Sequence, residues 1–364
     1  MEYNLQIAHR VSEIGEEAWD RLSGGRVFSS YRWYAFGEKV LENCPPTYIL
    51  LSRGGEPLAR ATFWLKRQEW LPITSKLARV GAERLMERRP LFACEAPLIS
   101  ISGLILPDTN EQSILLEKIA STAGKLAKQA HAISTLFGYI PGNEALQSAW
   151  PKTYSPISYS DSETSLELCW PDHESYIKHL AKSTRRNIKL HNKAADELTI
   201  AIETQPSVTA LDEAIHLIQN VETHHKVGHR PWTQAMLQNA GMVDSMWISA
   251  GCGGRLIGCC SMLGDGTAKT ATLLGLDYSF SQWIYVYYQL IYAVVRCAIE
   301  SGGKVLYGGG GAYELKRRLG FKKLPDDYLL VEATGKLMDW LIKGSLRLMG
   351  AHGSSNDANN NTGF

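Results

Sequence analysis

Residues 305–321, VLYGGGGAYELKRRLGF, give the clearest indication of the fold. Val305, Leu306 and Tyr307 predict a short buried strand, the glycines at 308–311 predict a loop, and AYELKRRLG predicts a helix that ends at Gly320. Glycine lets a backbone or a ligand approach closely, and free N–H groups at the start of a helix suit an anion. An ordinary tight turn fits equally well, because the loop lacks the GK[ST] of a P-loop and the GxGxxG of a dinucleotide fold.

The segments on either side extend this pattern. Residues 273–307 predict a strand, a loop, a long helix, a turn and a strand, and residues 317–333, RRLGFKKLPDDYLLVEA, return as a strand. This order, with LGF before the last strand, resembles the C-terminal half of the GNAT acyltransferase fold. It is most similar to the Fem-type, BioF2-like (FemAB-like) branch, in which two such units are joined in one chain. The resemblance covers residues 160–335 and is only topological before them.

The resemblance implies a tandem GNAT-like fold of the α/β (α+β) class, with two mixed β-sheets that are each flanked by helices. We expect a degenerate N-terminal GNAT-like domain at 1–155, a C-terminal GNAT-like domain at 156–349 and a disordered tail at 350–364. The chain has 364 residues and is 45% hydrophobic, which is enough for one large or two medium cores.

Charge and cysteine content limit the partners. The formal net charge is +1, so no overall field attracts DNA or a membrane. The seven cysteines are scattered and odd in number, which fits reduced thiols in a cytoplasmic protein. The start, MEYNLQIAHR, is not a signal peptide, and the longest apolar stretch is too short for a transmembrane segment. A predicted basic helix at 336–349 could make peripheral membrane contact, although core packing is the simpler interpretation.

A single long helix is predicted for residues 172–198, and it contains a basic cluster. The cluster consists of Lys182, Arg185, Arg186, Lys189 and Lys193. A charge run of this kind is usually a solvated surface. However, the segment also resembles the Lys-x-x-Arg-Arg-Asn helix of Fem-type transferases, where such residues meet phosphate or carboxylate. The predicted donor-binding residues are therefore Lys182, Arg185, Arg186, Lys189, Gly309, Gly310 and Lys316.

The resemblance also implies where the acyl group of the donor lies. In the GNAT fold it sits beside a splay between two central strands, whose freed N–H groups polarise the carbonyl. That splay should fall near residues 273–276. CoA-dependent members carry R/Q-x-x-G-x-G/A in the loop that opens the next helix, whereas DYSFSQWIYV (277–286) has no glycine. This departure argues against acetyl-CoA and favours an aminoacyl-tRNA donor.

Three residues are candidates for proton transfer. Tyr313 matches the tyrosine that often precedes LGF in GNAT proteins. Tyr288 belongs to a row of tyrosines that more often indicates core packing, although a tyrosine can protonate a leaving group. His225 could accept a proton from an ammonium group. We expect no metal site at His224, His225 and His229, because no Glu follows in HExxH form and Gly228 and Pro231 break the helix. Cys259 and Cys260 are expected to be buried.

Together these features predict an N-acyltransferase that works by direct attack of an amine. Its donor substrate would be an acyl-CoA or an aminoacyl-tRNA, so charged tRNA would be a partner in the second case, and no cofactor would be bound permanently. Peptidoglycan precursors, amino acids and small natural-product amines all remain open as the amine acceptor. The alternative is a catalytically inactive GNAT-fold protein with a binding or scaffolding role, which the missing pyrophosphate motif would also fit.

Overall fold

The computed structural model describes residues 2–68, 76–142, 150–159 and 163–335, and these form two compact units. Unit 1 comprises the described residues of Met1–Leu22, Asn43–Tyr159 and Asp326–Phe364, and unit 2 comprises those of Ser23–Glu42 and Ser160–Pro325. Each unit therefore receives a segment from the other half of the sequence. The predicted division after residue 155 takes no account of these two segments, and the predicted helix at 336–349 and tail at 350–364 lie outside the described residues.

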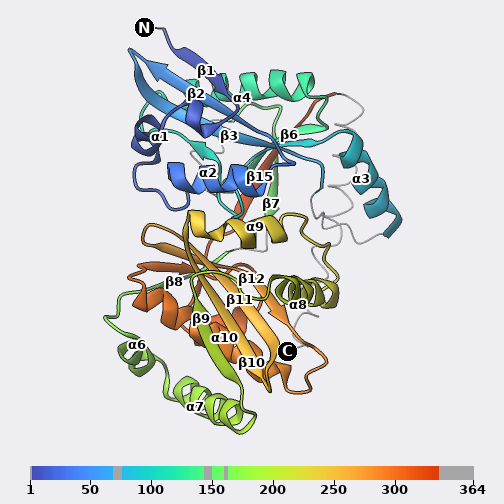
Figure 1. Cartoon of the computed structure of the whole chain (residues 1–364). Helices are drawn as coiled ribbons and strands as arrows, with labels where there is room; N and C mark the ends of the chain where they lie inside the picture. Colours follow the sequence, from blue (N-terminus) through green and yellow to red (C-terminus); the bar gives the residue numbers. More distant parts are fainter. Residues whose placement is uncertain (1, 69–75, 143–149, 160–162, 336–364) are drawn as a thin grey trace. The chain divides into compact units, whose positions relative to one another are not determined.

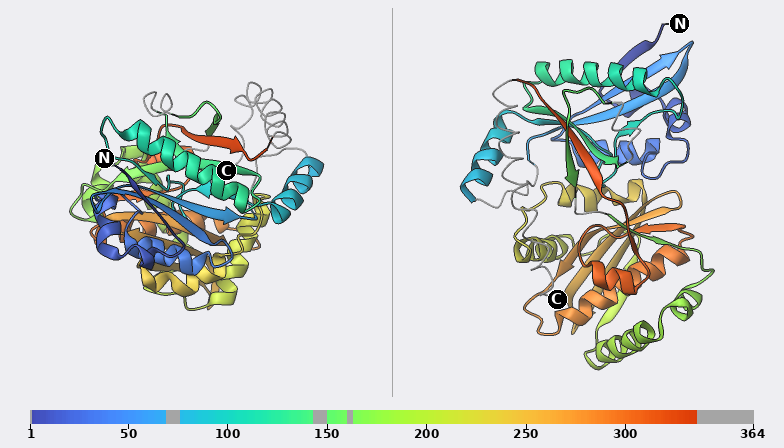
Figure 2. Two further views of the ribbon diagram at one scale, coloured as in Figure 1. Left: turned by 90° about the horizontal axis from the view of Figure 1, so that it is seen from above. Right: turned by 180° about the vertical axis from the view of Figure 1, so that it is seen from behind.

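Unit 1 contains a mixed eight-stranded sheet in the order β1-β2-β3-β4-β6-β15-β7, with β5 paired to β3. Its strands are β1 (Asn4–Ala8), β2 (Pro46–Arg53), β3 (Glu56–Lys66), β4 (Leu91–Cys94), β5 (Leu104–Ile105), β6 (Ser134–Pro141), β7 (Ser155–Tyr159) and β15 (Asp327–Ala333). Its helices are η1 (Val11–Glu13), α1 (Glu16–Ser23), α3 (Lys76–Arg88) and α4 (Gln112–Gln129). Strand β15, the last of the described strands, pairs antiparallel with both β6 and β7 and so lies inside this sheet (Figures 1 and 2).

Local chemistry explains the main elements of unit 1. Gly54 and Gly55 both have positive φ, which is the requirement of the tight turn that joins β2 to β3 as a hairpin. Helix α4 buries an apolar stripe against the sheet, in the spacing that a 3.6-residue period gives. The stripe consists of Leu115, Leu116, Ile119, Ala120, Ala123 and Ala127. In the core below it Phe63 stacks on Phe92 with ring centroids 4.5 Å apart.

Unit 2 contains a seven-stranded sheet in the order β14-β8-β13-β12-β11-β10-β9. Its strands are β8 (Thr164–Glu167), β9 (Ala201–Gln205), β10 (Asp244–Cys252), β11 (Arg255–Asp265), β12 (Ala268–Leu276), β13 (Val305–Tyr307) and β14 (Lys322–Lys323). Its helices are α2 (Tyr31–Val40), α6 (His173–His179), α7 (Lys182–Glu197), α8 (Leu211–His224), α9 (Thr233–Asn239), η2 (Ala240–Met242), α10 (Trp283–Glu300) and α11 (Tyr313–Arg318). The two mixed sheets with flanking helices confirm the fold class predicted from the sequence.

Two glycines let helices approach the sheet of unit 2 closely from opposite faces. A Cβ at Gly275 would lie 2.9 Å from the backbone nitrogen of Ile218 in α8. A Cβ at Gly258 would lie 2.5 Å from a methyl group of Val286 in α10. Gly275 pairs with Cys259, the neighbour of Gly258, and successive residues of a strand face opposite sides. Helices α8 and α10 therefore cover opposite faces of β11 and β12 (Figure 1).

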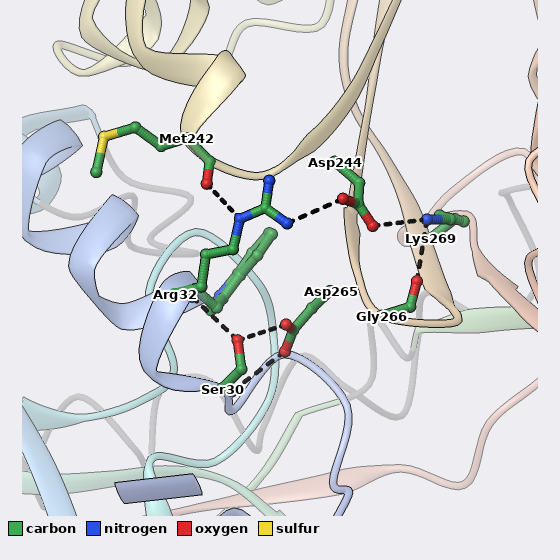
Figure 3. A network of polar contacts seen from close by, with 8 residues as sticks. Ser30, Arg32, Met242, Asp244, Asp265, Gly266 and Lys269 are labelled. Atoms are coloured by element: carbon green, nitrogen blue, oxygen red, sulfur yellow. Dashed lines mark hydrogen bonds and ion pairs between the residues drawn. The ribbon is translucent and has the colours of Figure 1, made fainter. Parts of the chain in front are cut away.

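Polar contacts attach α2 to unit 2 (Figure 3). Ser30 is the N-cap of α2, since its hydroxyl accepts a hydrogen bond from the third residue of the helix, and the same hydroxyl donates to Asp265. Arg32 donates from Nε to the carbonyl oxygen of Met242, 2.6 Å away, and from Nη1 to Asp244, 3.1 Å away. A segment near the start of the sequence thus becomes part of unit 2.

A buried lysine, Lys269, shares the carboxylate of Asp244 with Arg32 (Figure 3). Lys269 is 5% exposed, and its ammonium group donates to Asp244 at 3.1 Å and to the carbonyl oxygen of Gly266 at 3.0 Å. A buried ammonium group is costly without partners, and Asp244 provides one for Lys269. The same carboxylate also pairs with the exposed Arg32.

Two predictions of local structure are wrong. The predicted helix at 172–198 is two helices, α6 and α7, because Leu180 and Ala181 adopt extended backbone conformations between them. The mixture of arginines and apolar residues at 66–95 predicts an irregular segment, but helix α3 and strand β4 lie within it.

Candidate functional site

The central feature of unit 2 is the point where the parallel strands β12 and β13 part. They pair over three residues only, from Ala268 opposite Val305 to Thr270 opposite Tyr307. Strand β13 ends there, whereas β12 continues to Leu276. In the described part of the chain, no other strand pairs with β12 on the side that β13 has left. The separation lies where the sequence predicts a splay.

Two backbone N–H groups of β12 face this opening. Asp277 donates its N–H to the carbonyl oxygen of Ile257, next to β11, so alternation places the N–H of Gly275 on the β11 side as well. The N–H groups of Leu274 and Leu276 therefore point to the opposite side, where β13 has ended. A shift in register opposite Ser261 marks a bulge at Thr272 just before these residues, and bulges commonly terminate pairing and redirect a strand.

The turn between β12 and α10 contains a carboxylate, that of Asp277, which accepts hydrogen bonds from the turn itself. One carboxylate oxygen of Asp277 accepts hydrogen bonds from the N–H of Ser279, 2.9 Å away, and from its hydroxyl group. The other accepts from Arg255 at 3.1 Å. Burial alone would raise the pKa of Asp277, but these hydrogen bonds and the charge of Arg255 lower it overall, so the group is ionised at neutral pH. A phosphate at this turn would meet a fixed negative charge.

Aromatic rings surround the same turn. His224, the last residue of α8, stacks on Tyr278 with centroids 4.1 Å apart, and Trp283 meets Tyr278 edge-on at 5.0 Å. The exposed ring of His225 lies 5.2 Å from His224. Burial lowers the pKa of His225 and the charge of His224 lowers it further, so His225 is neutral at neutral pH and could accept a proton. The structure thus places this predicted residue beside the carboxyl end of β12.

The glycine loop at 308–311 is held by its own neighbours. The buried Lys316 donates to the carbonyl oxygens of Gly309 and Gly310, both 2.9 Å away, and the N–H of Gly309 donates to Glu163. These bonds commit Lys316 and Gly309 to the loop itself, which argues against their predicted role in holding a donor phosphate. Helix α11 begins at the half-buried Tyr313, after Ala312 at a φ of +46°.

Solved structures supply the comparison, since no protein-family model and no curated protein matches the sequence. FemX superposes with a TM-score of 0.57 at 11% identity, over 90% of this chain and 97% of FemX. A tandem GNAT protein from the clavulanic acid biosynthesis pathway gives 0.57 at 10% identity, over 92% of this chain and 99% of that protein. The chain has a tandem GNAT fold. L-PGS from Bacillus licheniformis gives 0.51 at 9% identity, over 95% and 99% of the two chains.

In the tandem GNAT fold of this chain, the basic cluster of α7 divides into two parts. Arg185 turns back and donates to the carbonyl oxygens of Lys178 and Leu180, 2.9 and 2.6 Å away, so it caps the end of α6. The remaining basic residues are exposed and fall within about 60° of the helix circumference at 100° per residue. These are Lys182, Arg186, Lys189 and Lys193. A small cavity of about 130 Å³ beside α7 is lined by Ile188 and Asn192 of this helix, and neither Arg185 nor Arg186 lines it.

Tyr288 lies between helices rather than at the strand opening. The ring of His191 from α7 stacks on it with centroids 4.0 Å apart, and Nδ1 of His191 lies 2.8 Å from the hydroxyl oxygen of Tyr292. The face of α10 that meets the sheet carries Val286 and Leu290 instead. This placement supports packing as the role of Tyr288.

Sequence reasoning missed a buried acid beside a histidine. Glu222, in the last turns of α8, is 3% exposed, and its carboxylate lies 2.9 Å from Nδ1 of His229. A charged residue on an apolar helical stripe, followed closely by a histidine, was the available signal. Across the described residues, no three His, Cys, Asp or Glu side chains gather as a metal site would require, and no helix there is long and apolar enough to cross a membrane.

Proposed function

We propose that unit 2 transfers an acyl group from an activated donor to an amine acceptor by direct attack. The observation that carries the proposal is the parting of β12 from β13, after which the N–H groups of Leu274 and Leu276 have no partner among the described strands. Two fixed amide donors at one opening are what a carbonyl needs as negative charge develops on its oxygen.

The chemistry follows from this arrangement. The donor carbonyl lies in the opening, and its oxygen accepts hydrogen bonds from the two N–H groups. The lone pair of the amine attacks the carbonyl carbon, the C–N bond forms, and the bond to sulfur or oxygen of the donor breaks. The leaving group takes up a proton. Positioning and amide hydrogen bonds supply most of the rate enhancement in such a reaction, so no covalent intermediate with the protein is needed.

The donor is an aminoacyl-tRNA or an acyl-CoA. Asp277, in the turn between β12 and α10, favours the first, because its ionised carboxylate already takes the N–H of Ser279 that a pyrophosphate would use. The second is supported by the clavulanic acid pathway protein, whose structure is described as lacking acetyl-CoA. The exposed basic stripe of α7 suits the phosphates of either donor.

The proposal is tested by supplying both donor classes. The purified protein is incubated with radiolabelled acetyl-CoA, or with a mixture of charged tRNAs, together with a panel of primary amines. We expect label in an amide product with one donor class, above the rate without protein. If neither donor gives product although the protein retains one of them on a filter, an inactive binding or scaffolding protein becomes the better description.

Neighbouring arginines on α7 give a matched pair of variants. We expect Arg186→Ala to weaken donor binding several-fold while leaving stability unchanged, because its exposed guanidinium group has no protein partner among the described residues. Arg185→Ala should instead cost about 1 kcal/mol of unfolding free energy, since it removes the hydrogen bonds to Lys178 and Leu180. Donor titration and urea unfolding of both variants check this, and unchanged donor affinity in Arg186→Ala would refute its role.

A further inference from the structure

The buried carboxylate of Glu222 has an organised set of partners. One oxygen lies 2.9 Å from Nδ1 of His229, and the other accepts from the backbone N–H of Arg230 at 3.4 Å and lies 3.5 Å from its guanidinium group. The side chain of Glu222 is 3% exposed, whereas that of His229 is 55% exposed. A buried carboxylate thus holds a histidine that is open to solvent.

This contact fixes the tautomer of the neutral ring. An ionised carboxylate can only accept hydrogen bonds, so Nδ1 of His229 must be the donor. Nε2 of the neutral ring then carries the lone pair, and in the described part of the chain it has no hydrogen-bond partner. The arrangement is that of a base whose orientation is set by a buried acid.

The pair lies at the carboxyl end of β12. Helix α8 runs beside β12 in the same direction, because Ile218 contacts Gly275 and His224 stacks on Tyr278. Glu222 follows Ile218 by four residues, which places it on the same face of α8 and about 6 Å further along the helix. That distance carries it to the level of Asp277, immediately past the N–H groups of Leu274 and Leu276.

We propose that His229, oriented by Glu222, is the proton acceptor for the amine in the transfer reaction. The inference rests on the proposed function and names a base for it. Nε2 takes one proton from the ammonium group of the acceptor, and the freed lone pair attacks the donor carbonyl. After the attack the nitrogen still carries two protons. One of them goes to the departing thiolate or alkoxide, and the amide keeps the other. The proton held by His229 returns to solvent, so the protein ends unchanged.

His225, the residue predicted from the sequence, differs from His229 in one respect. It has no carboxylate partner in the described chain, and its neighbour is another histidine. A purely structural purpose for Glu222 is the competing explanation, since its bonds also tie the loop after α8 back to the helix. The two explanations differ in how activity depends on pH.

Several charged or titratable groups lie on the end of α8 and on the loop that carries His229. Glu222 contacts His229 directly, and Arg230, the next residue in the chain, pairs with Glu222. His224 and His225 lie at the end of α8, where His224 stacks on Tyr278. Tyr278, whose pKa is raised by burial, stays protonated over the pH range of the test.

The experiment measures kcat against pH for wild type, His229→Gln, Glu222→Gln and the control His216→Gln, which changes an exposed histidine on α8. The donor is acetyl-CoA or charged tRNA, whichever supports transfer by the wild type. We expect His229→Gln to lower kcat about 100-fold at neutral pH. The loss should shrink as pH rises, because the amine then sheds its proton without help. Glu222→Gln should lower kcat by a smaller factor with the same dependence on pH, since an amide no longer requires Nδ1 of the ring to be the donor.

Several results would contradict the proposed role of His229. A pH-independent loss in both variants, or rates equal to those of His216→Gln, would overturn the role of His229 while leaving acyl transfer intact. Absence of transfer by the wild type with either donor would remove the proposed function and this inference together. As a measurement independent of activity, ¹⁵N spectra of the histidine rings should show a neutral His229 protonated at Nδ1; protonation at Nε2 instead would overturn the inference.

Discussion

Replacing the backbone N–H of Leu276 or Leu274 by an ester oxygen is expected to lower kcat by about 100-fold at one or both positions, the usual effect of losing one oxyanion donor. The substitution introduces the α-hydroxy acid analogue of leucine, which keeps the side chain. Both N–H groups face away from β11, so their loss removes no hydrogen bond of the sheet. The assay is single-turnover acyl transfer with the donor that supports activity.

The same exchange at Gly275 is the matched control, because its N–H points to β11. We expect the Gly275 ester to lose about 1 kcal/mol of unfolding free energy, the value of one hydrogen bond, and to keep kcat within a few-fold. If all three esters react at the wild-type rate, the opening between β12 and β13 does not hold the oxyanion.

Asp244→Ala is expected to reduce the free energy of unfolding by about 3 kcal/mol, the low end of the range for breaking a buried ion pair. The reason lies at Lys269, which is buried and, of its partners among the described residues, would keep only the carbonyl oxygen of Gly266. Asp244→Ala also releases Arg32 of α2, but that contact is exposed and contributes little. Urea unfolding followed by far-UV circular dichroism gives the value.

Two further variants separate these contributions. Arg32→Ala alone should cost less than 1 kcal/mol, because its side chain is 57% exposed. The double variant Asp244→Ala, Lys269→Met should recover much of the lost stability, since an apolar side chain needs no partner in the same space. A double variant as unstable as Asp244→Ala would show that the buried charge is not the cause.

The sequence was sufficient for the architecture, because that depends on the order and period of elements. The stretch at 305–321 predicts strand, loop and helix, and β13, the glycine loop and α11 follow in that order. The side-chain assignments within it were less secure. Lys316 was expected to face a ligand, but spacing could not show that it folds back onto the carbonyl oxygens of Gly309 and Gly310.

The site residues were harder to predict, because their roles depend on contacts between residues of different elements, which spacing along the sequence does not show. Arg185 and Arg186 are adjacent and of one type, yet only the first meets the end of α6, because a break at Leu180 and Ala181 turns that end toward it. The pairing of Glu222 with His229 depends on the chain folding back after α8. A helical period identifies the buried stripe but does not show what a buried acid on it will bind.

The position of β15 has a consequence for the order in which the protein is made. Strand β1 of unit 1 is synthesised before any strand of unit 2, but the sheet of unit 1 lacks the strand between β6 and β7 until residue 333 has been synthesised. Until then β6 has no neighbour on that side, and an unpaired strand edge invites association with other chains. The unit that starts first therefore finishes last, and a nascent chain stalled before residue 327 should be the form that most needs a chaperone.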